Sequence, residues 1–284
     1  AGDKIITGSA DDDTIRLSGI TDLQVQPKAI STAKPRPATP EQTLILGWNE
    51  RAMTIITELN NYVAAGSTVT VVAEPISNRA ELELEYAGFE NQTVSFIEGD
   101  IADRTTLDSL PMQIYQHVIV LSYSDDLEIQ QADSRTLITL LHLRDMVEKK
   151  AHTFSIVSEM LDVRNRELAE VTQADDFIVS DKLVGLMLSQ VAENKELARV
   201  FADLFDAAGS EIYLKPARDY VALDQPLNFY TVLEAAARRG EIVLGYRLKS
   251  ESSADQKYGV HVNPAKIQPV TFSAGDRIII LANE

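Results

Sequence analysis

The chain has 284 residues, of which 45% are hydrophobic and 24% charged, an ordinary globular composition in a chain long enough to bury a core. Its formal net charge is -17, and a surface of this sign repels phosphate backbones, so nucleic acid is not an expected partner. The absence of cysteine excludes disulfides, thiolate nucleophiles and cysteine-ligated zinc. No run approaches the roughly 20 apolar residues of a membrane helix.

Two nearly identical segments stand at the ends, AGDKII at 1–6 and AGDRII at 274–279. In each, a Gly-Asp turn leads into a β-branched run, which is typical of a turn followed by a strand. We therefore expect residues 1–20 to hold the final strand of a preceding module of the same kind. The acidic run 11–13 is expected to be a solvated turn. Residues 21–42 predict a linker: the stretch KAISTAKPRPATPEQ carries three prolines and no apolar period, so no folded element is expected there.

From residue 43 onward, short apolar runs alternate with segments of helical periodicity. Strands are predicted at 43–46, 68–73, 94–97, 117–121, 153–157 and 177–179, and helices at 51–64, 78–87, 107–110 and 130–147. Continuously apolar strands that alternate with helices are typical of a parallel sheet covered on both faces. Right-handed crossovers then give a doubly wound, Rossmann-like α/β sheet.

A long crossover helix is predicted at 182–208. After it, the pattern of predicted strands and helices changes. Strands at 211–215, 242–247 and 277–281 and a helix at 230–239 predict a small α+β lobe. The expected domains are thus a Rossmann-like lobe with its crossover helix at 43–208 and a C-terminal lobe at 209–284.

Ligands of a doubly wound sheet bind at the carboxyl ends of its strands. The first such loop keeps Gly47 as the first glycine of a G-x-G-x-x-G/A dinucleotide fingerprint, but Asn49 replaces the second. Ala52 suits the third position, and Glu74 ends the second strand 22 residues after it, where an acid would bind a ribose. Trp48 is suited either to stack on a base or to pack in the core.

Polar residues also follow the later strands, at Asp100, Ser122, Ser158 and Glu159. We expect them to face the same crevice, although helix capping equally explains the two serines. The candidate cofactor-binding residues are Gly47, Trp48, Asn49, Glu74, Asp100, Ser122 and Glu159. The cofactor is left open among NAD, an adenine nucleotide and calcium.

An acidic patch, Asp125, Asp126, Glu128 and Asp133, runs into the helix predicted at 130–147. Its oxygens could ligate calcium, with Asp125 and Asp126 as the candidate ligands, or they could complement the helix dipole. The four histidines show no metal-binding spacing, and the chain has no nucleophile elbow and no Walker loop. We therefore predict no catalytic residues and no enzyme.

Several segments resemble the Castor and Pollux family of plant channels, within the broader group of RCK or TrkA-type regulatory domains of potassium channels and transporters. They are LILGWNERAMTIITELNNY, TVTVVAEP, HVIVLSYSDD, QQADSRTLITLLHLR, SDKLVGLMLSQVA, and VNPAK followed by AGDRIIILANE, so the resemblance covers 43–284. It implies a soluble module on the cytoplasmic side of a membrane protein that forms homo-oligomers through the crossover helix. Two modules per subunit would form a gating ring below a tetrameric pore that lies outside this chain, and nucleotides or calcium would shift the ring.

The sequence therefore favours a regulatory module that couples a ligand, bound in the crevice or at the acidic patch, to ion flux. Two alternatives stay open. An NAD-dependent oxidoreductase would need an intact glycine fingerprint and a placed acid or base, and both are missing. A structural ring-former without a ligand would differ from the regulatory module only in binding nothing.

Overall fold

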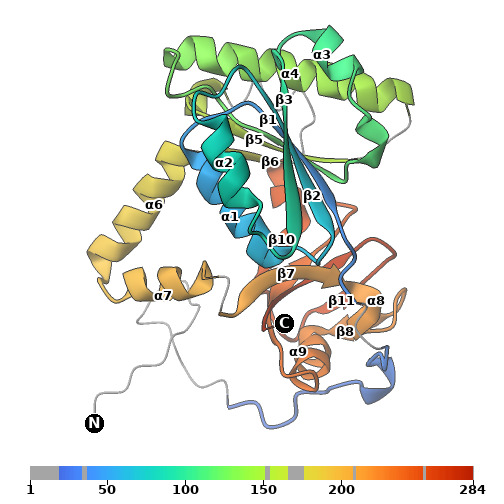
Figure 1. Ribbon diagram of the computed structural model, residues 1–284. Helices are drawn as coiled ribbons and strands as arrows, with labels where there is room; N and C mark the ends of the chain where they lie inside the picture. The colour runs from blue at the N-terminus through green and yellow to red at the C-terminus, as the bar shows by residue number, and fades with distance from the viewer. Residues whose placement is uncertain are drawn as a thin grey trace. The chain divides into compact units, whose positions relative to one another are not determined.

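The computed structural model describes residues 19–33, 37–150, 154–165, 176–206, 209–251 and 254–283. They form two compact units (Figure 1). One unit comprises residues 37–198, and the other combines residues 19–33 with the described residues from 199 onward. The strand expected at 1–6 and the acidic run at 11–13 lie outside the described residues.

The first unit contains a parallel sheet with the strand order β3-β2-β1-β4-β5-β6. Its elements are β1 (Gln42–Leu46), α1 (Arg51–Tyr62), β2 (Ser67–Ala73), α2 (Arg79–Tyr86), β3 (Gln92–Glu98), α3 (Arg104–Asp108), β4 (His117–Val120), α4 (Ile129–Lys150), β5 (Ser155–Met160), β6 (Asp176–Val179) and α6 (Ser180–Glu193). The order reverses between β1 and β4, which is the switch point where a doubly wound sheet opens a crevice. The predicted Rossmann-like fold is confirmed.

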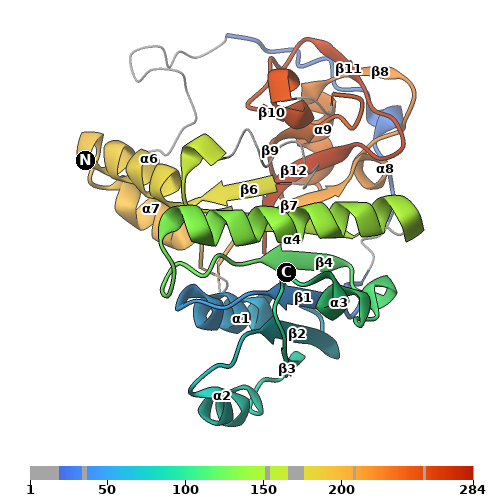
Figure 2. The same ribbon diagram turned by 90° about the horizontal axis from the view of Figure 1, so that it is seen from above.

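Two separate cores cover the faces of this sheet. Along β1, Leu44 and Leu46 pack on one face with residues of α3 and α4, while Ile45 packs on the other face with residues of α1 and α2. Figure 1 shows α4 on one side of the sheet and α1 and α2 on the other, and Figure 2 shows α4 in front of the strands. Because both faces are buried, the strands are apolar at consecutive positions, which is why they could be predicted from the sequence.

The predicted crossover helix at 182–208 is wrong as a single helix. The structure has two helices, α6 and α7 (Leu197–Leu204), separated at Asn194. The Asn194 side chain accepts a hydrogen bond from the backbone N–H of Glu196 (3.1 Å) and its carbonyl accepts one from Leu197. Asn194 thus begins a new helix, as asparagine commonly does. The predicted end at Ala208 lies outside the described residues.

The second unit is built on an antiparallel sheet, β10-β9-β12-β7. Its elements are α7, β7 (Glu211–Pro216), α8 (Ala217–Tyr220), β8 (Pro226–Asn228), α9 (Phe229–Ala237), β9 (Ile242–Arg247), β10 (Val260–Val262), β11 (Pro269–Thr271) and β12 (Arg277–Ala282). Strands β8 and β11 form a second, small sheet. The small α+β lobe predicted here is confirmed in its strands and in its helix.

The repeated Gly-Asp motif has a structural role in its second copy. Gly275 has a φ of 106°, a left-handed conformation that favours glycine. The Asp276 carboxylate accepts hydrogen bonds from the backbone N–H groups of Lys249 and Ser273, both at 2.7 Å. The motif therefore builds the turn that starts β12.

Residues 23–33, which the sequence predicts as part of a free linker, lie against the second unit. They contain a short 3₁₀ turn, Pro27–Ala29, and Ala29 is buried in that unit's core. The prediction that no folded element occurs there is therefore wrong for this stretch. The domain borders at 20/21, 42/43 and 208/209 stay a prediction.

Candidate functional site

The carboxyl ends of the parallel strands bring most of the predicted crevice residues into two connected groups. Asn49, Ser122 and Glu159 meet at the ends of β1, β4 and β5. Glu74 and Asp100 meet at the ends of β2 and β3 through an arginine, Arg135.

Gly47 is required by the packing of the chain itself. Its φ is 94°, and a Cβ atom at this position would lie 2.3 Å from the carbonyl oxygen of Leu121 in the neighbouring strand end. The fingerprint's first glycine is thus explained without a ligand, by the close approach of two backbone segments.

Asn49 fills the position where the fingerprint has its second glycine. Its side chain is buried, and its amide nitrogen donates to the carbonyl oxygen of Ser122 (2.7 Å) and to Glu159 Oε2 (2.8 Å). Glu159 Oε2 also accepts a hydrogen bond from the backbone N–H of Ser122 (3.2 Å). The Ser122 hydroxyl is buried without a hydrogen-bond partner among the described residues. Asn49 therefore ties β1 to β4 and β5 across the switch point.

The N-terminus of α1, which binds pyrophosphate in dinucleotide-binding folds, has its N–H groups satisfied by the chain. The N–H of Glu50 donates to Asp125 Oδ2 (2.7 Å), that of Arg51 to the Asn49 side chain (3.0 Å), and that of Ala52 to the Asn49 carbonyl (3.0 Å). An anion that bound here would have to displace these acceptors.

An ion pair lies across the same end of the sheet. Arg51 Nη2 lies 2.7 Å from Glu159 Oε1 and 3.0 Å from Ser124 Oγ. Glu159 is almost fully buried, so its charge needs this partner and the hydrogen bonds from Asn49 and Ser122. The crevice near the switch point is thus occupied by the chain's own charged groups.

Arg135, on α4, holds the two acids of the other group. The same nitrogen, Nη2, lies 2.6 Å from Glu74 Oε1 and 2.7 Å from Asp100 Oδ1. The guanidinium stacks over the ring of Tyr123, with its central carbon 4.7 Å from the ring centroid. Burial lowers the pKa of Arg135, but the hydrogen bonds to Glu74 and Asp100 outweigh it, so the net pKa is raised.

Sequence reasoning missed Arg135. Its partners lie 61 and 35 residues away along the chain, so no local motif links them. One signal was available, because the first turns of a helix that follows a parallel strand lie at the carboxyl edge of the sheet. A basic residue two turns into α4 was therefore a candidate partner for Glu74 and Asp100.

Trp48 packs rather than standing free at the crevice. Its ring meets that of Phe96 edge-on, with 5.9 Å between the centroids, and it lies against the core under α1 and α2. Of its two predicted roles, the structure shows the packing role.

The candidate calcium ligands are placed differently from each other. Asp125 uses Oδ2 to accept from Glu50 and Oδ1 to accept from the Ser124 hydroxyl, while Asp126 is exposed. Within the described residues, no group of three or more His, Asp or Glu could hold a metal ion. Asp133 is buried and accepts from the backbone N–H groups of Leu161 and Asp162, so it shapes the loop after β5. The calcium interpretation of Asp125 and Asp126 stays a prediction.

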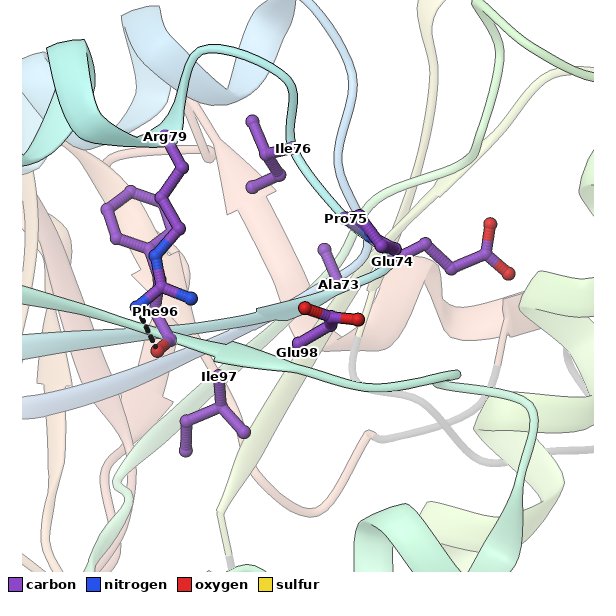
Figure 3. Close-up of a pocket in the computed structure, with 8 residues that line it drawn as sticks. All are labelled: Ala73, Glu74, Pro75, Ile76, Arg79, Phe96, Ile97 and Glu98. Carbon is purple, nitrogen blue, oxygen red and sulfur yellow. Dashed lines mark hydrogen bonds between the residues drawn. The ribbon is translucent and has the colours of Figure 1, made fainter.

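A small depression lies beside the Glu74 end of the crevice, between β3 and the loop after β2 (Figure 3). Its volume is about 80 Å³, well below the roughly 300 Å³ at which small-molecule sites begin. Arg79 crosses it and donates to the carbonyl oxygen of Phe96 (3.2 Å), and the Glu74 carboxylate points away from Arg79. The depression could take one small group of a ligand and not a whole nucleotide.

At the opposite edge of the sheet, the structure brings together a serine, a histidine and a carboxylate. His117 Nδ1 lies 2.7 Å from Ser155 Oγ, and its Nε2 lies 3.2 Å from Glu41 Oε2. This edge is where α4 ends, and the carbonyl dipoles of a helix end disfavour the oxyanion of acyl transfer. We interpret the group as a connection between β1, β4 and β5.

Comparison with known proteins shows what the whole chain resembles. It is 29% identical over 317 residues to the ion channel DMI1 of Medicago truncatula, a match covering 99% of this chain and 35% of the relative. It is 28% identical to the ion channel POLLUX of Lotus japonicus and 29% identical to the probable ion channel CASTOR of rice, over 99% and 100% of this chain. The chain is similar along its whole length to ion channels of the Castor/Pollux family. The resemblance predicted from its sequence segments is confirmed.

The match covers only part of each relative, and this limits what it implies for the chain. The chain spans about a third of the length of the curated Castor/Pollux relatives it matches. The human SLO3 gating ring has a similar fold, with a TM-score of 0.58 and 12% identity over 86% of this chain and 44% of that chain. No protein-family model matches the chain.

Two features of the described residues bear on assembly and membranes. Helix α6 carries four half-exposed or exposed apolar side chains, Leu183, Val184, Leu186 and Leu188. None of the helices in the described ranges is long and apolar enough to cross a membrane.

Proposed function

We propose that this chain is a regulatory, ring-forming part of an ion channel or transporter, on the cytoplasmic side of a membrane and assembled with copies of itself. The similarity to ion channels along 99% or more of the chain carries the proposal. The likeness in fold to a gating ring, which extends over 86% of the chain, supports it.

Ligand sensing at the crevice is the finer part of the proposal. The Glu74 and Asp100 side chains are 47% and 50% exposed, and a single arginine holds both. Ribose hydroxyls or a cation from solution could therefore compete with Arg135 for these carboxylates. The α1 N-terminus and the Arg51–Glu159 pair are satisfied internally, so we place the ligand at the Glu74–Asp100 end. NAD, an adenine nucleotide and calcium remain the candidates.

Arg135 gives such a ligand a route to the rest of the module. It belongs to α4, and its two carboxylate partners lie at the ends of β2 and β3. A ligand that releases Arg135 changes how α4 is held against the sheet. A ligand with different affinities for the two arrangements shifts the balance between them, which is what regulation requires.

Binding is tested by thermal unfolding of the chain with and without NAD, NADH, ATP, ADP or calcium. A ligand at a hundredfold excess over its dissociation constant stabilises the native state by about 2.7 kcal/mol. We expect one candidate to raise the midpoint in the wild type and in Glu81→Ala, an exposed control on α2, but not in Glu74→Ala. If none raises it, the ligand-free ring-former is the better interpretation, and the internal filling of the crevice already agrees with that alternative.

Regulation is tested on the full-length protein that contains this chain, reconstituted in liposomes. Arg135→Gln should change the ion flux by severalfold, because it frees Glu74 and Asp100. Arg144→Gln is the matched control, since it lies on the same helix and removes an ion pair with Glu148 that does not involve Glu74 or Asp100. Equal flux in wild type and both variants, with the protein folded, would contradict the proposal. Consumption of NADH by the purified protein would instead favour the oxidoreductase.

Assembly through the crossover region is proposed from α6. Its exposed leucine and valine side chains are those expected of a contact with another chain. Light scattering of the chain should give a mass above that of one copy.

A further inference from the structure

The segment that precedes the Rossmann-like unit is bound along the second unit as an added strand. Its Ser31 N–H donates to the carbonyl oxygen of Tyr220 (2.8 Å), and the N–H of Ala222 donates to that of Ala29 (2.7 Å). Between these bonds, Ile30 pairs with Val221 in an antiparallel bridge. Figures 1 and 2 both show this segment, in blue, beside α8.

Side chains of the second unit hold the segment on both sides of this bridge. The Asn228 amide donates to the carbonyl oxygens of Leu23 (3.0 Å) and Gln24 (2.9 Å). The Thr231 hydroxyl accepts from the N–H of Gln26 (3.1 Å), and Arg239 donates to the carbonyl oxygen of Ala33 (2.8 Å). These side chains form hydrogen bonds with backbone atoms of the segment, as in the addition of a strand to a sheet edge.

Two further features show that the segment belongs to this surface. Ala29 is 5% exposed and contributes to the same core as Tyr220, Val221 and Leu227. Gln24 has a φ of 49°, and a non-glycine residue keeps such a left-handed conformation where its surroundings hold it. Asn228, which binds the Gln24 carbonyl, also caps α9 through the N–H of Thr231 (3.0 Å).

We propose that residues 23–33 form a strap, bound in the same chain, that fastens the chain upstream of the Rossmann-like unit to the second unit. The Rossmann-like unit is then an insertion, because residues on both sides of it in the sequence belong to the second unit. The functional consequence, which rests on the proposed function, is that a displacement of the second unit acts directly on the upstream chain. A free linker at 21–42 would not transmit it.

The strap's position is tested by an engineered disulfide between Ile30→Cys and Val221→Cys. The wild-type chain has no cysteine, so no native thiol competes. Residues 30 and 221 are a non-hydrogen-bonded antiparallel pair, whose Cα atoms lie about 4.5 Å apart, within disulfide range. In the matched control, Thr32→Cys with Val221→Cys, the two residues are diagonal neighbours whose Cα atoms lie about 7–8 Å apart, beyond the usual disulfide range.

We expect mild oxidation to give a disulfide within one chain in the first pair and little in the control. A disulfide that joins two chains would overturn binding within the same chain, because the strap would then be exchanged between copies. Equal oxidation of both pairs would overturn the docked position.

Hydrogen exchange tests the strap without cysteine. Ala29→Glu puts a charge into the buried position, whereas Ala33→Glu makes the same change at an exposed one. Exchange of the amides of Gln26, Ile30 and Ser31 should speed up at least tenfold in Ala29→Glu and stay unchanged in Ala33→Glu. Unprotected exchange of these amides in the wild type would overturn the proposal.

The transmission of movement is tested on the full-length protein with the 30–221 cysteine pair. Ion flux should differ between the oxidised and reduced forms, while the wild type treated in the same way should not change. If Arg135→Gln alters the flux and the locked strap does not, the transmission fails and the proposed function stands. If neither alters it, the proposed function fails, and the disulfide and exchange results still decide whether the strap exists.

Discussion

Asn49 stands where a dinucleotide fingerprint has its second glycine, and it connects strand ends instead of leaving room for a pyrophosphate. Its side chain donates to Ser122 and Glu159 and accepts from the N–H of Arg51, so all of its polar atoms are used inside the protein. Glycine in this place would let a pyrophosphate approach, but it would leave Glu159 with fewer donors. The residue that weakens the cofactor fingerprint is thus the one that stabilises the switch point.

Replacing Asn49 tests this role directly. Asn49→Ala should lower the free energy of unfolding by about 1–3 kcal/mol, because the Ser122 carbonyl and the buried Glu159 lose a donor. Asn61→Ala, at an exposed position of α1, is the control and should change stability by less than about 0.5 kcal/mol. Urea unfolding measures both. Equal midpoints for the two variants would mean that the buried network contributes little.

Tyr86 gives a prediction about pH. Its hydroxyl is buried with no hydrogen-bond partner among the described residues, and burial, with a smaller contribution from Glu85, raises its pKa to about 12 from 10.0. The folded state therefore keeps the proton where the unfolded chain loses it. The contribution of Tyr86 to stability is intact below pH 10 and is lost as the pH rises toward 12.

Tyr86→Phe should remove that part of the alkaline loss and should leave stability at pH 7 unchanged or higher, because an unpartnered hydroxyl is no longer buried. Denaturant unfolding at pH 7, 10 and 11 measures the difference from wild type. Tyr258→Phe, at an exposed tyrosine, should follow the wild type at all three values. A larger alkaline loss in Tyr86→Phe than in wild type would contradict the assignment.

At the scale of elements, the strands of the Rossmann-like sheet could be predicted because burial on both faces makes them apolar at consecutive positions. The break at Asn194 was not predicted, since apolar spacing continues from α6 into α7 and one capping side chain decides the boundary. The strap at 23–33 was not predicted either. Its bonds use mainly backbone atoms and its only buried side chain is Ala29, so the side-chain pattern of this stretch carries almost no signal.

The candidate site divides in the same way. The acids at the strand ends, Glu74, Asp100 and Glu159, could be placed from the sheet topology alone. Their pairing with Arg135 and Arg51 was not predicted, because an ion pair depends on the reach of a long side chain from another element. The internal filling of the crevice results from these ion pairs. Each pair joins residues from different segments of the chain, so no single segment predicts it.

Helix α6 allows a prediction about assembly. Leu188 is 65% exposed, and a charge there should weaken any contact that buries the apolar side of this helix. Leu188→Glu should lower the mass measured by light scattering toward that of one chain. Leu84→Glu is the matched control on α2, where the leucine is 78% exposed, and it should keep the wild-type mass. An unchanged mass in Leu188→Glu would place the assembly contact elsewhere.

At the scale of the whole molecule, the net charge of -17 opposes folding through repulsion among like charges. The screening length falls from about 30 Å at 0.01 M salt to about 8 Å at 0.15 M, so added salt should raise the midpoint of thermal unfolding. A diffuse ion atmosphere responds to ionic strength and not to the identity of the cation.

The same titration separates this general effect from a specific metal site. Both carboxylate oxygens of Asp125 already accept hydrogen bonds, so we expect NaCl, MgCl₂ and CaCl₂ at equal ionic strength to raise the midpoint equally. A larger rise with calcium that disappears in Asp126→Asn, but persists in the exposed control Glu85→Gln, would establish calcium binding at the acidic patch. The calcium site would then lie in the loop that connects β4 to α4. Binding there would have to break the hydrogen bond from the Glu50 N–H to Asp125 at the N-terminus of α1. Calcium would in that case loosen the internal filling of the crevice at the N-terminus of α1.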